Sequence, residues 1–169
     1  GPFADAATDR LLGLIDLNVR ATTEMCSRLL PSMVARGTGH ILNVSSLSAF
    51  QPVPTMATYA ASKAFLMSLT EALSEELRGT GVSVTALCPG FTQTDMIDEI
   101  QAASSTVRGI PKAFLSKPAD VAAQGYRALM ARQTVLVPGL SNQITAAWAQ
   151  VTPRWVTRYV AGFATRNKT

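Results

Sequence analysis

The sequence has 169 residues, of which 47% are hydrophobic and 15% are charged, a balance that indicates a folded globular domain and excludes a disordered chain. No apolar run reaches the length needed to cross a membrane, and the first residues lack the basic and apolar regions of a secretory signal. The formal net charge is +4, but no nucleic-acid-reading motif accompanies it, so we expect no nucleic-acid partner.

The first predicted element is a long helix over residues 7–36, because apolar side chains recur there at helical spacing. Pro31 lies late in this helix and is expected to kink it or to end its main part. A short β-rich run follows at 40–46 and ends in two serines. Two prolines then mark residues 48–56 as a loop.

A second helix is predicted over residues 57–78, where Gly-Thr-Gly follows it. Residues 82–90 are almost continuously apolar, as expected for a strand buried on both faces of a parallel sheet. A further helix is predicted over 117–132 and a further short strand over 134–139. This alternation of helices and strands predicts an α/β fold with a parallel sheet between layers of helices.

Polar residues stand where sites form in such folds, near the carboxyl ends of strands. Ser46 ends the first strand, and Tyr59 and Lys63 open the helix that follows. The phenol and the ammonium are four residues apart and therefore share a helix face. Asn18 is an amide within the otherwise apolar first helix. Taken singly, each has an ordinary structural explanation, such as a turn cap for the serine or a buried hydrogen-bonded amide for Asn18.

Taken together, these residues resemble the short-chain dehydrogenase/reductase family. The stretch "YAASK" at 59–63 matches the Y-x-x-x-K signature of that family, and Ser46 precedes the tyrosine by thirteen residues, as its catalytic serine does. Asn18 in "LNV" matches the family's asparagine on the preceding helix. "PG" at 89–90, followed by Thr94, matches the loop beside the nicotinamide. The resemblance covers residues 10–140 and implies a Rossmann-like, doubly wound parallel sheet.

The resemblance implies an NAD or NADP cofactor and a role for each matched residue. Tyr59 would be the general acid and base for a carbonyl or alcohol, while Ser46 would hold the substrate oxygen. An ordinary phenol titrates near pH 10, and a neighbouring ammonium stabilises phenolate, so Lys63 is expected to make this chemistry possible near neutral pH. Lys63 would also bind the ribose, and Asn18 would support a proton relay. The cofactor-binding residues implied in this way are Tyr59, Lys63, Pro89, Gly90, Phe91, Thr92 and Thr94.

No glycine-rich phosphate-binding turn occurs in the sequence, although a dinucleotide fold begins with one. We therefore expect residues 1–140 to be the C-terminal part of a Rossmann-like domain, with a substrate lid at 91–117. Apolar residues in this lid indicate a small apolar substrate, or else packing of the lid onto the body. An alternative function is a non-catalytic scaffold or interaction domain that has lost the phosphate-binding half. A serine hydrolase is disfavoured, because neither G-x-S-x-G nor S-x-x-K occurs.

Residues 141–169 are predicted to form an amphipathic helical extension. No acidic residue follows Asp120, whereas several arginines do. Three roles remain for this extension, in order of expectation: packing over the substrate site or core, contact between copies, and contact with a membrane surface.

Two cysteines and one histidine provide neither a disulfide framework nor a metal site, so we expect a cytoplasmic protein without a metal. Family members are commonly dimers or tetramers built through the helices that match 7–36 and 57–78. The resemblance therefore implies a homo-oligomer here.

Overall fold

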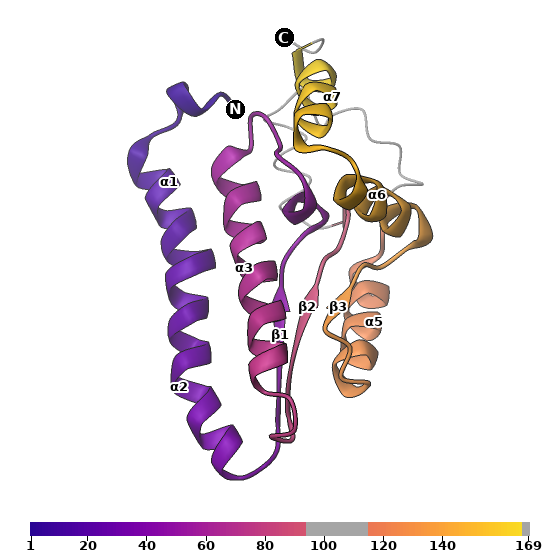
Figure 1. Ribbon diagram of the computed structural model, residues 1–169. Coiled ribbons are helices and arrows are strands. Elements are labelled where there is room, and N and C mark those ends of the chain that lie inside the picture. Colours follow the sequence, from indigo (N-terminus) through magenta and orange to yellow (C-terminus); the bar gives the residue numbers. More distant parts are fainter. Residues whose placement is uncertain (94–114, 167–169) are drawn as a thin grey trace.

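The structure is a computed structural model that describes residues 1–93 and 115–166 (Figure 1). After a short 3-10 turn, η1 (Phe3–Asp5), the predicted first helix runs as α1 (Thr8–Ile15), a π-helical turn η2 (Asp16–Arg20) and α2 (Ala21–Ala35). Pro31 lies inside α2, so the helix continues past it rather than ending there. Leu30 and Met33, on either side of it, pack against the core, and these contacts hold the helix together across the missing hydrogen bond.

Three parallel strands form the sheet in the described part of the chain, in the order β1-β2-β3. They are β1 (Gly39–Val44), β2 (Val82–Leu87) and β3 (Val135–Leu136). Strand β1 pairs with β2 from Gly39 opposite Val82 to Val44 opposite Leu87, and Ala86 lies opposite Val135. Because the strands are parallel, their carboxyl ends meet at one edge of the sheet.

Helices cover both faces of this sheet. On one face, α2 and α3 (Ala57–Glu76) enclose a core of Leu77, Val82 and Val84. On the other face lies α5 (Pro118–Met130), where a Cβ added to Gly125 would lie 2.9 Å from Leu87 Cδ2. All six residues of β2 are buried, which confirms the expected central strand with two covered faces. The predicted α/β fold with a parallel sheet is therefore confirmed.

The remaining elements lie near the carboxyl edge of the sheet. A 3-10 turn, η3 (Leu47–Phe50), follows β1 and contacts both α3 and α6 (Leu140–Val151). The predicted C-terminal extension forms two helices, α6 and α7 (Arg154–Arg166), which meet at Pro153. Most of the predicted lid, including Met96, Ile97, Ile100, Val107, Ile110 and Phe114, lies outside the described residues.

Candidate active site

Asn18 lies in the middle of η2, the π-helical turn that interrupts the first helix. Such turns are rare and often occur at functional sites, because the extra residue re-aims side chains. The Asn18 side chain uses both ends of its amide: Nδ2 donates to Ser62 Oγ at 3.0 Å, and Oδ1 accepts from Lys63 Nζ at 3.4 Å. The turn therefore directs the amide at the start of α3.

Lys63 is held at the junction of β1 and α3. Its Nζ donates to the carbonyl oxygen of Val44 at 2.9 Å and lies 5.7 Å from the centre of the Tyr59 ring. The phenol and the ammonium therefore share a helix face, as their spacing predicts. An ammonium has three N–H donors, and two of the Lys63 donors have partners among the described residues, so one remains for a ligand.

The environment of Lys63 favours its neutral form more than water does. Desolvation by burial lowers the pKa of Lys63 below its usual value, and the charge of a Cys88 thiolate would act in the opposite direction. Burial, however, raises the pKa of Cys88 to about 11, so this thiol is uncharged at neutral pH. Desolvation therefore dominates at Lys63, and Cys88 is unsuited to act as a nucleophile.

Ser46 leaves β1 in an extended conformation and caps η3. Its Oγ accepts a hydrogen bond from Ser48 N at 3.2 Å, and its own proton has no acceptor among the described residues. The neighbouring Ser45 donates to the carbonyl oxygen of Lys63 at 2.7 Å and so ties the end of β1 to α3. The structure records no hydrogen bond between the described side chains of Ser46 and Tyr59.

The loop after β2 follows the same edge of the sheet. The carbonyl oxygen of Pro89 accepts a hydrogen bond from Leu47 N at 2.8 Å, which links this loop to η3. Thr92 pairs with Ser116 in an isolated parallel bridge, and Phe91 is exposed. Thr94 lies outside the described residues.

Gly90 has a packing role that its motif does not reveal. A Cβ at this position would lie 2.6 Å from Oδ1 of Asn142, a residue of α6. The family resemblance places this glycine in the cofactor-binding loop, where the absence of a Cβ would let the backbone approach a ligand closely. In the structure, the amide of Asn142 already fills the space beside it.

Sequence reasoning did not identify three groups in or beside this network. They are the hydroxyls of Ser62 and Ser48 and the backbone carbonyl of Val44, which binds Lys63. Ser62 is buried and bridges the site, since it donates to the carbonyl oxygen of Tyr59 at 2.8 Å and accepts from Asn18. Its one signal in the sequence was its place directly before Lys63. The Ser48 hydroxyl is buried and has no hydrogen-bond partner in the described part of the chain. Buried hydroxyls normally have a hydrogen-bond partner, and the described residues supply none for this one.

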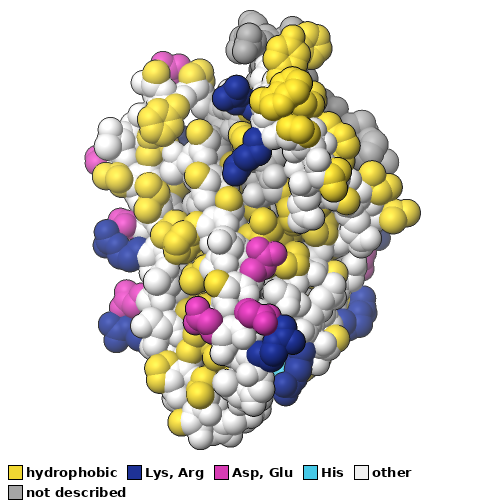
Figure 2. Space-filling view, viewed as in Figure 1, with side chains coloured by type: hydrophobic (Ala, Val, Ile, Leu, Met, Phe, Trp, Pro, Cys, Tyr) yellow, Lys and Arg dark blue, Asp and Glu magenta, His cyan; other side chains and the backbone are white. Residues whose placement is uncertain are grey.

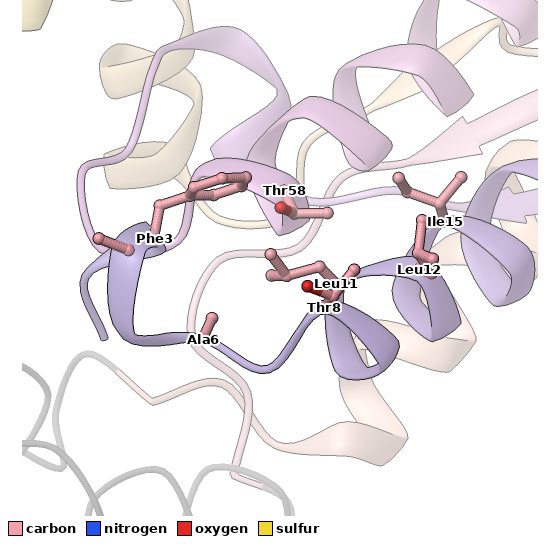
Figure 3. Close-up of a pocket in the computed structure, with 8 residues that line it drawn as sticks. Phe3, Ala6, Thr8, Leu11, Leu12, Ile15 and Thr58 are labelled. Atoms are coloured by element: carbon pink, nitrogen blue, oxygen red, sulfur yellow. The ribbon is translucent and has the colours of Figure 1, made fainter.

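Two adjoining hollows lie along α1 and the start of α3, and the second of them reaches Ser62 of this network. One has a volume of 460 Å³, and in Figure 3 Phe3 faces Thr58 across it while Leu11, Leu12 and Ile15 border it. The other, of 430 Å³, extends along α3 to Ala61 and Ser62. Both are lined mainly by apolar side chains, which suits an apolar partner better than a charged cofactor.

Comparison with known proteins identifies relatives for most of the chain. The model of the short chain dehydrogenase family matches residues 1–105. The ketoacyl reductase HetN of Nostoc sp. is 33% identical over 171 residues, which is 96% of this chain and 58% of that protein. An uncharacterized oxidoreductase of Myxococcus xanthus is 46% identical over 88 residues, or 52% of this chain and 35% of its own length. The chain thus spans about a third to three fifths of these curated relatives.

Solved structures share the fold. A short-chain dehydrogenase from Sphingobium yanoikuyae in complex with NADPH aligns with a TM-score of 0.73 and 27% identity, over 100% of this chain and 60% of that one. A 7beta-hydroxysteroid dehydrogenase aligns with a TM-score of 0.81 and 21% identity, over 96% of this chain and 62% of that one. At that identity the second likeness shows the fold alone.

Proposed function

Because this chain belongs to the short chain dehydrogenase family, we propose that it carries the catalytic half of an NAD(P)-dependent oxidoreductase that interconverts a carbonyl and an alcohol. The observation that carries the proposal is the network at the carboxyl end of β1. There, Lys63 binds both Asn18 and the carbonyl oxygen of Val44 and lies beside the ring of Tyr59. A scaffold domain would have no need to hold a partly desolvated ammonium against a phenol.

In the proposed reaction, side chains of this chain transfer the proton. The cofactor, when bound, supplies the hydride in reduction and accepts it in oxidation. Tyr59 gives a proton to the substrate oxygen in reduction and takes it back in oxidation. Lys63 stabilises the phenolate that remains after proton donation. Ser46 donates its free hydroxyl proton to the same substrate oxygen, and Asn18 orients Lys63 and supports the relay of protons from solvent.

The residues present fit the nicotinamide end of such a cofactor. Lys63 keeps one N–H donor for the ribose hydroxyls, and the loop of Pro89, Gly90, Phe91 and Thr92 runs along the same edge of the sheet. Tyr59 and Thr94 complete the proposed set, the latter outside the described residues. The orphaned Ser48 hydroxyl is a further polar group in this region.

The proposed substrate is a small apolar carbonyl compound or alcohol, and the residues expected to line it fall mostly in the segment outside the description. We also propose a cytoplasmic homo-oligomer. Exposed apolar side chains on α1, η2 and α2, together with the apolar hollows beside α3, support association through these helices. These exposed side chains include Leu12, Leu17, Met25 and Leu29.

The test combines cofactor titration with two tyrosine variants of the purified protein. Tyr59→Phe should retain NADPH or NADH binding, followed by fluorescence, but lose about 10²–10⁴-fold in turnover of a ketone found by screening. The control Tyr126→Phe changes an exposed tyrosine on α5 and should retain full turnover. Near-full turnover by Tyr59→Phe would refute the role of Tyr59. Failure of the unaltered protein to bind either cofactor would support the scaffold alternative instead.

A further inference from the structure

The two C-terminal helices bury small side chains and expose large ones. Helix α6 turns Ala146 and Ala149 inward, and α7 turns Thr157 inward with only 2% of its surface accessible. A helix that packs on a globular core normally does the reverse, placing its large apolar side chains inside. The large apolar side chains of α6 and α7 therefore do not pack on the described core of this chain.

Large apolar side chains recur at helical spacing on both helices and are exposed. On α7, Trp155, Tyr159 and Phe163 recur every four residues, and their side chains are 67%, 71% and 63% exposed. On α6, spacings of four, four and three residues separate Leu140, Ile144, Trp148 and Val151. The C-terminal stripe consists of Leu140, Ile144, Trp148, Val151, Trp155, Tyr159 and Phe163, all exposed. Figure 2 shows hydrophobic side chains gathered over α7 at the upper end of the molecule.

Positive charge accompanies the C-terminal stripe, and the extension itself contributes no acidic residue. Arg154 and Arg158 are exposed on α7, four residues apart, and neither has an ion-pair partner among the described residues. Figure 2 shows cationic groups directly beside the hydrophobic cluster. Residues 121–169 contain no Asp or Glu at all. If two copies met symmetrically through this face, they would bring these arginines together with no neighbouring acid on the extension to neutralise them.

We propose that the C-terminal stripe binds the surface of an anionic lipid bilayer. Helices that lie in a membrane interface combine an apolar face carrying Trp or Phe with basic residues on the polar side. Trp and Tyr favour the level of the headgroups, and each Arg near an anionic surface adds electrostatic attraction. None of the helices within residues 1–93 and 115–166 is long and apolar enough to cross a membrane.

The protein carries its own reporter of this contact. Trp148 and Trp155 are its two tryptophans, and both belong to the C-terminal stripe. With the full chain, vesicles of equal parts phosphatidylcholine and phosphatidylglycerol should shift the tryptophan emission to shorter wavelength and carry the protein into the pellet on sedimentation. Brominated acyl chains should quench the emission. Vesicles of phosphatidylcholine alone should bind far less, and added salt should release the protein from the anionic ones.

Two pairs of variants separate the charge from the apolar contribution. Arg154→Gln with Arg158→Gln should weaken binding to anionic vesicles about 30-fold. The same double change at Arg127 and Arg132, on α5 and just after it, is the control and should matter little. Tyr159→Ala with Phe163→Ala keeps both tryptophans and should weaken binding about tenfold or more.

The control for the aromatic variant is Tyr126→Ala with Met130→Ala, an exposed pair with the same spacing on α5. Circular dichroism melts check that each variant is folded. The proposal is overturned if the unaltered protein binds no anionic vesicles, or if the arginine variant binds as well as its control. It is equally overturned if the aromatic variant binds vesicles as the unaltered protein does and changes only the oligomeric mass in solution, because the stripe would then be a contact between copies. A change in ketone turnover alone would overturn it too, because the stripe would then cover the substrate site.

Discussion

Replacement of Gly90 by alanine tests the packing of the loop after β2 against α6. The added Cβ would lie 2.6 Å from Oδ1, 2.7 Å from Nδ2 and 2.8 Å from Cγ of Asn142, all far inside van der Waals contact. The Asn142 side chain cannot simply rotate away, because its Nδ2 donates to the carbonyl oxygen of Pro138 at 2.7 Å. The methyl group must therefore displace a side chain that is already engaged.

The expected cost has two parts. Losing the hydrogen bond from Asn142 to Pro138 costs about 1 kcal/mol, and crowding a packed contact costs about 1–3 kcal/mol more. We expect Gly90→Ala to lower the free energy of unfolding by about 2–4 kcal/mol and the melting temperature by about 4–16 °C for a chain of this size. Asn142→Ala alone should cost about 1 kcal/mol, because it loses the hydrogen bond without the clash.

The double variant Gly90→Ala with Asn142→Ala decides whether the clash is the cause. Once the amide is gone, the three atoms nearest to the added methyl are removed, so the double variant should be about as stable as Asn142→Ala alone. Urea unfolding followed by circular dichroism measures all four proteins. If the two single effects add in the double variant, or if Gly90→Ala melts with the unaltered protein, the packing argument is wrong.

Four further predictions concern single sites. Gly13→Ala, in open space within α1, should raise stability by about 0.5–1 kcal/mol in urea unfolding, and a loss would contradict the open surface. Ser62→Ala should cost about 1–2 kcal/mol in the same assay, since it strips partners from Asn18 and the Tyr59 carbonyl, and no change would mean that the bridge is weak. Cys88, with its pKa raised to about 11, should resist iodoacetamide in the folded protein and react only after unfolding, as mass spectrometry would show. Burial lowers the pKa of Lys63 below 10.5, so the unfolded chain holds this proton to higher pH than the folded one. The free energy of unfolding of the unaltered protein, relative to that of Lys63→Met, should therefore rise with pH up to about 10. A difference between the two proteins that does not change with pH would contradict this prediction.

The layers of the fold could be predicted because hydrophobic patterning is a local property. Residues 82–90 read as a doubly covered strand, and β2 is buried at every position from Val82 to Leu87. The continuation of α2 past Pro31 could not be read in the same way, because it depends on core contacts made by its neighbours. The extension at 141–169 was expected as one amphipathic unit, and Pro153 divides it into two helices.

In the candidate site, too, local spacing could be predicted from the sequence and contacts between distant residues could not. The shared face of Tyr59 and Lys63 follows from their spacing, and the assigned roles of both residues stay predictions. The partners of Lys63 come from elsewhere in the chain, since Asn18 is 45 residues away and Val44 is 19 residues away. No local pattern places these groups together, and neither does one place Asn142 against Gly90. The large outward side chains of α7 do not pack on the described core, and the role of the extension stays a prediction.

The π-helical turn η2 also lets one helix absorb an extra residue without changing which way its two halves face. It accommodates one more residue than an α-helical turn over the same rise. Deleting one residue within Asp16–Arg20 would therefore leave an ordinary α-helical turn, and Leu11 and Ile15 would keep their places along the hollow beside Phe3. The deletion would instead remove the wide turn that carries Asn18. In this helix, a deletion would change the geometry around Asn18 rather than the packing of α1.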